Sequence, residues 1–114
     1  MAFLALAVAA CGSSSSSHSL ALLGSAIQQD CTLVSDVLSD GPDPDADPVG
    51  YAQAQILPLR QLSIGDATLQ SAVTSLAAAY EMFSKSTGGT HAAAAQTVTK
   101  AENKVNKICP QAAP

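Results

Sequence analysis

Two stretches in the second half of the chain repeat apolar residues at alternating steps of four and three. The first stretch contains Leu69, Val73, Leu76, Tyr80 and Phe83. The second contains Ala94, Val98, Ala101, Val105 and Ile108. This spacing places the apolar side chains on one face of an α-helix, as in a coiled-coil seam. Each stretch therefore predicts a helix that buries this face against other helices.

The first half of the chain carries two further apolar stripes with helical spacing. One comprises Leu20, Leu23, Ile27, Cys31, Val34 and Leu38. The other comprises Val49, Ala52, Ile56, Leu59 and Leu62. Pro58 falls inside the second stripe, where it removes a backbone donor. We therefore expect this helix to be kinked at Pro58, or to be divided in two there.

Breaks between the predicted helices carry recognisable capping residues. Gly41 can adopt the left-handed conformation that ends a helix, and a proline follows it. Asp47 stands where an N-cap is expected, with Pro48 at the first helical position. Asp66 and Thr90 are the expected N-caps of the third and fourth helices. These signals predict where each helix begins.

The pattern as a whole predicts an all-α fold. No alternation of the kind that marks a strand extends over a useful length. Hydrophobic residues make up 47% of the chain and aromatic residues only 4%, so the core consists mainly of small aliphatic side chains that suit close helix packing. Four helices with short connections predict an antiparallel up-down-up-down four-helix bundle over residues 19–114. The N-terminal part of the first helix is expected to overhang this bundle or to be extended linker.

An apolar run from Met1 ends in Val8-Ala9-Ala10 and is followed by Cys11, Gly12 and five serines. This order resembles a bacterial lipoprotein signal with its lipobox, of the kind found in small actinobacterial lipoproteins. The resemblance implies that residues 1–10 are a signal remnant, that Cys11 carries acyl chains such as palmitate, and that residues 11–18 are a tether. The mature domain would then lie on the extracytoplasmic face of the cell membrane.

Residues 1–10 contain no Lys or Arg, so the basic part of such a signal is expected upstream of Met1. The alternative interpretation of the same run is a buried N-terminal helix that ends in a cysteine.

The remaining cysteines form an even pair if Cys11 is lipidated. In an oxidising compartment Cys31 and Cys109, 78 positions apart, are expected to form a structural disulfide. This bond would place the first helix beside the fourth. Two distant cysteines lack the ligand spacing of a metal site, so none is expected.

The charge pattern bears on the partners of the chain. The formal net charge is −4, with the aspartates concentrated in the first half and four of the five cations in the last third. An acidic chain without a basic patch is not expected to bind nucleic acid. Asp43, Asp45 and Asp47 resemble the start of a calcium loop, but Pro48 and Ala54 occupy the positions that require Gly and Glu. An acidic turn explains this segment better.

The candidate chemistry is sparse, so we expect neither an enzyme nor a cofactor. Neither His18 nor His91 lies beside a cysteine or carboxylate, and both are expected to be solvated. The favoured function is a non-catalytic module that contacts an envelope protein. The alternative is a carrier of a small hydrophobic ligand or haem, for which Tyr51, Tyr80, Met82 and Phe83 are candidates, although packing explains Tyr80 and Phe83 more simply.

Overall fold

The computed structural model describes the backbone of residues 15–114 and the side chains of residues 26–114. Within this part the chain is helical and contains no strand, which confirms the all-α prediction. The four helices are α1 (Ser15–Ser39), α2 (Pro48–Gln61), α3 (Ala67–Lys85) and α4 (His91–Ile108), and a short 3₁₀ turn, Gly88–Thr90, precedes α4. None of these described helices has the length and apolar character needed to cross a membrane.

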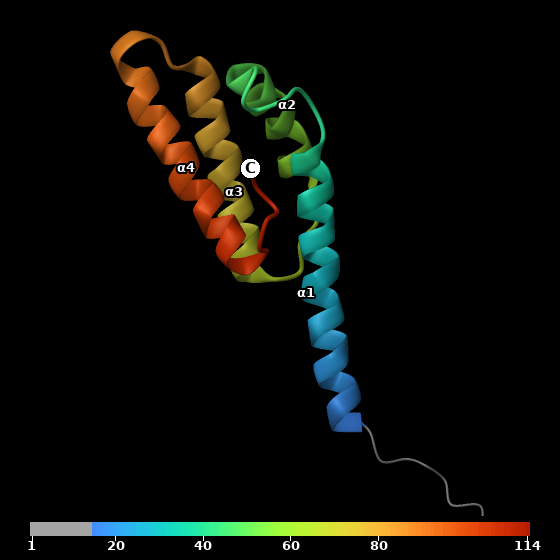
Figure 1. Ribbon diagram of the computed structural model, residues 1–114. Coiled ribbons are helices and arrows are strands. Elements are labelled where there is room, and N and C mark those ends of the chain that lie inside the picture. The colour runs from blue at the N-terminus through green and yellow to red at the C-terminus, as the bar shows by residue number, and fades with distance from the viewer. Residues whose placement is uncertain (1–14) are drawn as a thin grey trace, which may run out of the picture.

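Helix α3 is the central element of the packing. It lies against α2 on one side and α4 on the other, while α1 contacts α2 (Figure 1). Its predicted seam is buried along the whole helix, with Leu69, Val73 and Leu76 fully excluded from solvent. Tyr80 and Phe83 continue this buried face at the end of α3. The four-and-three spacing therefore identified the centre of the hydrophobic core.

Helix α1 begins at Ser15, inside the segment expected to be a serine tether. Its N-terminal part extends past the ends of the other helices, as the expected overhang would (Figure 1). Val34 and Leu38 pack in the core, and Cys31 is half-buried beside it. The expected lipidation site, Cys11, lies outside the described residues, and so do the side chains of Leu20 and Leu23.

Helix α2 begins as its capping residues predict. The Asp47 carboxylate accepts a hydrogen bond from the Gly50 backbone N–H at 2.9 Å, and Pro48 occupies the first turn. The helix continues through Pro58 to Gln61, so it is not divided in two. Its buried face includes Gln55, which the apolar stripe did not contain. The Gln55 side-chain amide donates to the Asp40 carbonyl at 2.6 Å and so holds the loop that precedes α2.

The predicted caps of the last two helices differ in outcome. The Asp66 side chain accepts a hydrogen bond from the Leu69 N–H at 2.8 Å, which confirms it as the N-cap of α3. Thr90 stands at the predicted N-cap position of α4, but its hydroxyl donates to the Thr87 carbonyl at 2.9 Å and caps no N–H of the helix. The preceding 3₁₀ turn already gives Thr90 helical dihedral angles, whereas an N-cap side chain needs an extended backbone to reach the next turn.

The structure contains the expected disulfide. It joins Cys31 in α1 to Cys109, directly after α4, with the two Cα atoms 5.4 Å apart. Residues 110–114 then turn back along the bundle (Figure 1). Gln111 adopts a positive φ of 65° at this reversal, and Ala112 and Ala113 are buried.

Candidate functional site

A cavity of about 220 Å³ lies where α2, α3, α4, the Asp-rich loop and the last residue of the chain meet. The described side chains that line it are Pro44, Asp45, Pro48, Tyr51, Ala52, Tyr80, Phe83, Ala95, Val98, Glu102 and Pro114. Four of these, Tyr51, Ala52, Tyr80 and Phe83, are buried. The cavity is therefore walled by rings and aliphatic groups, with a few polar atoms among them.

The start of α2 positions Tyr51 in this wall. Its backbone N–H donates to the Asp47 carbonyl at 2.9 Å, which fixes it in the first turn. Its phenol Oη donates to the Leu38 carbonyl at 2.6 Å, in the last turn of α1, where carbonyls lack helical partners. Burial raises the pKa of Tyr51 to about 12, so this side chain is a neutral hydrogen-bond donor at physiological pH.

Tyr80 and Glu102 form the polar pair of the cavity. The Tyr80 Oη donates to Glu102 Oε2 at 2.9 Å, and the Tyr80 ring meets the Tyr51 ring edge to face with centroids 5.8 Å apart. Burial, followed by the charge of Glu102, raises the pKa of Tyr80. Burial also raises the pKa of Glu102, and the hydrogen bond from Tyr80 offsets only part of that effect. The carboxylate is thus poorly solvated and has one hydrogen-bond partner among the described side chains.

The other glutamate has the opposite electrostatic environment. Glu81 accepts hydrogen bonds from Lys85 in the same helix, at 2.8 Å, and from Arg60 in α2. The hydrogen bond from Lys85, then that from Arg60, lowers the pKa of Glu81 to about 2. Both ion pairs found among the described residues belong to Glu81, so Glu102 has no cation within ion-pair distance there.

The C-terminal segment closes one side of the cavity through Pro114. The Asn106 side chain holds this segment by two hydrogen bonds to the Ala113 backbone. Its Oδ1 accepts from the Ala113 N–H at 2.8 Å, and its Nδ2 donates to the Ala113 carbonyl at 3.2 Å. The Asn106 side chain of α4 therefore helps to hold Pro114 against the cavity.

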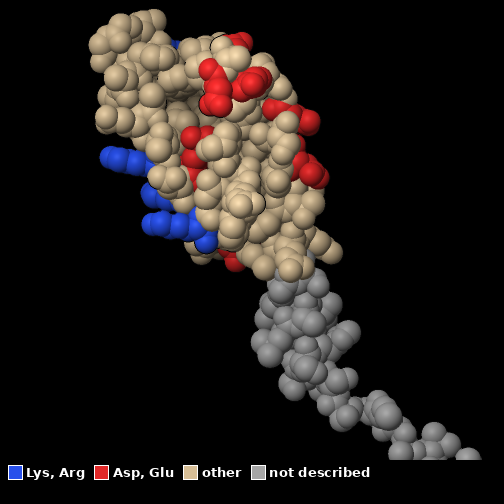
Figure 2. Space-filling model, viewed as in Figure 1, with Lys and Arg blue, Asp and Glu red and all other residues tan. Residues whose placement is uncertain are grey.

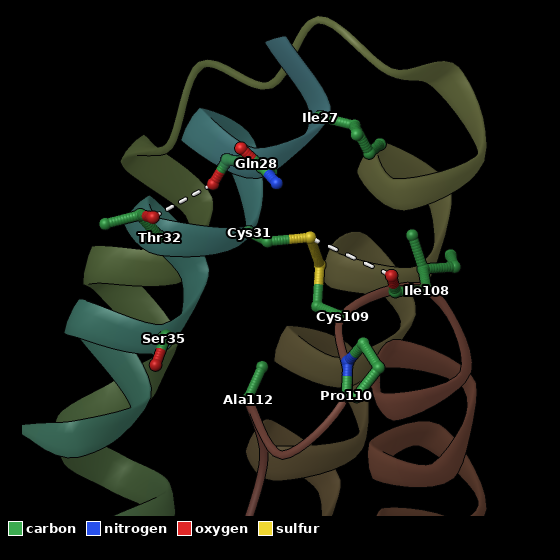
Figure 3. A pocket seen from close by; sticks show the side chains of 9 residues that line it. All are labelled: Ile27, Gln28, Cys31, Thr32, Ser35, Ile108, Cys109, Pro110 and Ala112. Carbon is green, nitrogen blue, oxygen red and sulfur yellow. Dashed lines mark hydrogen bonds between the residues drawn. A yellow bond between two sulfur atoms is a disulfide. The ribbon is translucent and has the colours of Figure 1, made fainter. Parts of the chain in front are cut away.

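A second depression, about 500 Å³ in volume, surrounds the disulfide (Figure 3). Figure 3 shows Gln28, Thr32 and Ser35 on the α1 side and Pro110 and Ala112 on the opposite side. The Cys31 Sγ lies 3.9 Å from the Ile108 carbonyl oxygen, a contact without a proton because the sulfur is in a disulfide. Cys109 and Ala112 are the buried members of this wall, so it offers less enclosed surface than the cavity at Tyr80.

Of the four residues considered for ligand binding, three line the cavity and one lies on the surface. Tyr51, Tyr80 and Phe83 line the cavity, whereas Met82 is 60% exposed and does not. The volume is below the range of about 300–1,000 Å³ that is typical of drug-sized ligands. A porphyrin does not fit this conformation of the cavity.

His91 is not the solvated surface group that we expected. It is half-buried, and its ring packs on Phe83 with centroids 4.5 Å apart. Its Nδ1 lies 2.9 Å from the Ser86 hydroxyl, but that hydroxyl donates to the Phe83 carbonyl at 2.7 Å. The Ser86 proton is therefore used to cap α3, and no described carboxylate bonds to His91 to orient it as a base.

Two of the three aspartates of the loop have structural roles. The Asp43 carboxylate accepts from the Asp45 N–H at 2.8 Å in an Asx turn, and Asp47 caps α2. In the part of the chain with described side chains, no three His, Cys, Asp or Glu residues are grouped so that they could hold a metal ion.

Two residues that shape the site were not singled out from the sequence, Glu102 and Asn106. Glu102 stands four positions after Val98, and this spacing places it at the edge of the apolar face of α4. A carboxylate at that position is a weak signal of a polar group near the core. Helical periodicity in the sequence does not predict the hydrogen bonds between Asn106 and Ala113.

No protein-family model, curated protein or solved structure matches this chain.

Proposed function

We propose that this chain is a lipid-anchored protein of the cell envelope that carries a small, mainly apolar ligand in the cavity at Tyr80. The observation that carries the proposal is the cavity of about 220 Å³ with buried aromatic walls and a hydrogen-bonded Tyr80–Glu102 pair. Apolar pockets with a few placed polar groups are the usual form of small-ligand sites. A cavity of about 150 Å³ already suffices for a benzene-sized molecule.

The location is part of the same proposal. The sequence from Val8 to Cys11 implies a lipid on Cys11 and an anchor in the extracytoplasmic face of the membrane. The Cys31–Cys109 disulfide supports an oxidising compartment, because such bonds persist mainly outside the cytoplasm. The protein would therefore meet its ligand in the cell envelope.

The scaffold that we propose is an antiparallel up-down-up-down four-helix bundle with α2 kinked at Pro58. The disulfide supports this topology because it holds the middle of α1 beside the end of α4. The continuity of α2 across Pro58 supports a kink, because the proline cannot donate to the Ala54 carbonyl.

A non-catalytic interaction module is the second candidate. It is favoured by three large apolar side chains that are exposed: Leu33 at 43%, Leu57 at 62% and Met82 at 60%. They belong to α1, α2 and α3 respectively. Because they are divided among three helices, they offer a partner less continuous apolar surface than a docking face normally has. The carrier is therefore the leading proposal.

Filling the cavity tests the carrier function. 1-Naphthol is a suitable probe because the chain contains no Trp to interfere with its fluorescence. Ala95 lines the cavity, whereas Ala92, on the same helix, is exposed and outside it. We expect saturable binding to the native protein and to Ala92→Phe, and a loss of at least about tenfold in affinity in Ala95→Phe. Equal binding by both variants, or no binding by the native protein, would overturn the proposal.

A further inference from the structure

The two cysteines of the disulfide differ in their exposure to solvent. Cys31 is half-buried on α1, whereas Cys109 is only 2% exposed. The depression of about 500 Å³ surrounds their bond, and both residues line it (Figure 3). Thiol–disulfide exchange begins when a thiolate attacks one of the two sulfurs, and its rate depends on access to that sulfur. An external thiol should therefore reach Cys31 more readily than Cys109.

The wall of the depression suits the approach of a thiolate. The attacking species in such an exchange carries a negative charge. None of the described side chains that line the depression is charged, so no carboxylate of this wall repels it. The charged side chains lie outside this wall, with Lys and Arg along the α4 edge and Asp and Glu nearer to α1 and α2 (Figure 2).

Helix α1 is fastened to the other helices mainly at its C-terminal end. Its core side chains, Val34 and Leu38, both follow Cys31 in the chain. The Leu38 carbonyl also accepts a hydrogen bond from α2. Among the described side chains that precede Cys31, Asp30 makes the one hydrogen bond to another element, from the Asp66 N–H at 3.2 Å. The part of α1 up to Cys31 is therefore held chiefly by the disulfide.

From the half-buried Cys31, the depression around it and this one-sided fastening of α1, we propose that the Cys31–Cys109 disulfide is a redox-sensitive latch opened by an external dithiol. The oxidised form is the resting state in an oxidising compartment. When the latch opens, α1 is freed up to Cys31, while Val34 and Leu38 keep its C-terminal end packed. The latch does not depend on the ligand cavity.

The reaction has two steps, in which the dithiol loses two electrons and the disulfide gains them. A thiolate of the dithiol first bonds to Cys31 Sγ, and the electron pair of the broken Sγ–Sγ bond goes to Cys109 Sγ. The second thiolate of the dithiol then attacks the first and displaces Cys31, which closes a disulfide in the dithiol. Each attacking thiol has released a proton to solvent, and each displaced cysteine sulfur takes one up.

A small thiol tests where the exchange begins. The Cys11→Ser protein is treated briefly with 2-mercaptoethanol and quenched with acid, and peptide mass spectrometry then locates the mixed disulfide. We expect the adduct on Cys31 in at least about tenfold excess over Cys109. An adduct mainly on Cys109, equal amounts on both, or no reaction of the folded protein would overturn the proposal.

Two neighbouring glutamines of α1 provide a matched pair of variants. Both are exposed, but Gln28 lines the depression and Gln29 does not. Gln28→Trp should fill the depression and slow the reaction with 2-mercaptoethanol at least about fivefold, whereas Gln29→Trp should slow it less than about twofold. Equal rates in the two variants would show that the thiol does not enter through the depression, and the proposal would fail.

NMR order parameters of the backbone amides test the release of α1. A rigid backbone gives values of about 0.85 and a flexible one gives values below about 0.6. On reduction of the Cys11→Ser protein with dithiothreitol, we expect residues 27–31 to fall below about 0.6, while residues 69–80 of α3 stay near about 0.85. The variant that also carries Cys31→Ser and Cys109→Ser should match the reduced protein with or without dithiothreitol. Unchanged values over residues 27–31 would mean that the bond is a structural cross-link only, and loss of order in α3 would mean that no separate latch exists.

Discussion

Glu102 shows how one residue acquires properties from its surroundings. In the sequence it is one of two glutamates, and the local difference is a cation, Lys85, four positions after Glu81. In the fold the pKa of Glu81 is lowered to about 2 by Lys85 and Arg60, whereas burial raises the pKa of Glu102. The pKa values of two identical side chains are therefore shifted in opposite directions because their neighbours differ.

This difference predicts a pH dependence of stability. A carboxyl group whose pKa is raised by folding contributes stability below its unfolded pKa, near 4.5, and that contribution is lost as the pH rises through the folded value. Glu102→Gln is therefore expected to flatten the fall in the free energy of unfolding above pH 4.5, because glutamine keeps an acceptor for Tyr80 but cannot ionise. Urea unfolding at a series of pH values measures this. An unchanged slope in Glu102→Gln would contradict it, and Glu81→Gln serves as the control because its effect lies at lower pH.

At the scale of the helix, capping depends on backbone geometry as well as on residue type. Asp66 and Thr90 are both favourable N-cap residues. Asp66 has an extended backbone, and its carboxylate reaches the Leu69 N–H. Thr90 follows a 3₁₀ turn, has helical dihedral angles and makes no such bond. The same kind of signal therefore identified both helix starts, but only Asp66 supplies a side-chain cap.

Alanine substitutions should separate these two positions. Asp66→Ala removes a cap hydrogen bond and is expected to lower the free energy of unfolding by about 1 kcal/mol. Thr90→Ala removes only an exposed hydrogen bond to the Thr87 carbonyl. It should change the free energy of unfolding by less than about 0.5 kcal/mol. Urea denaturation of both variants beside the native protein is the measurement. A loss for Thr90→Ala as large as that for Asp66→Ala would mean that Thr90 caps α4 after all.

At the scale of the whole molecule, the disulfide and the C-terminal segment connect the ends of the fold. Cys31 and Cys109 are 78 positions apart, so their bond restricts the unfolded chain over most of the domain. The segment after Cys109 then turns back to the cavity, where Asn106 holds Ala113. The segment that borders the cavity is therefore linked to the same end of α4 as the disulfide.

Reduction of this disulfide should lower the stability markedly. The loop-entropy estimate for such a span is about 4–5 kcal/mol, and measured losses on removing native disulfides are about 2–5 kcal/mol. In a Cys11→Ser background, we expect the urea midpoint to fall on reduction. The variant that also carries Cys31→Ser and Cys109→Ser should not respond to reductant. Coincident unfolding curves for the oxidised and reduced forms would contradict the prediction.

The sequence by itself determined the properties that depend on near neighbours in the chain. The seam from Leu69 to Phe83, the Asp47 and Asp66 caps and the stop at Gly41 all follow from helical spacing or from local backbone preferences, and the structure contains them. The disulfide was expected because the lipobox resemblance assigns Cys11 to a lipid and leaves Cys31 and Cys109 as a pair. Each of these inferences requires information from only a few positions.

Tertiary structure alone decided how the cavity is built. Tyr51, Tyr80 and Glu102 come from three different helices, and only the packing of those helices brings their side chains to one wall. The burial of Glu102, the contact of His91 with Phe83 and the clamp of Asn106 on Ala113 arise in the same way. Desolvation and long-range hydrogen bonds depend on which atoms surround a group in space. The helical periodicity of the sequence does not contain that information.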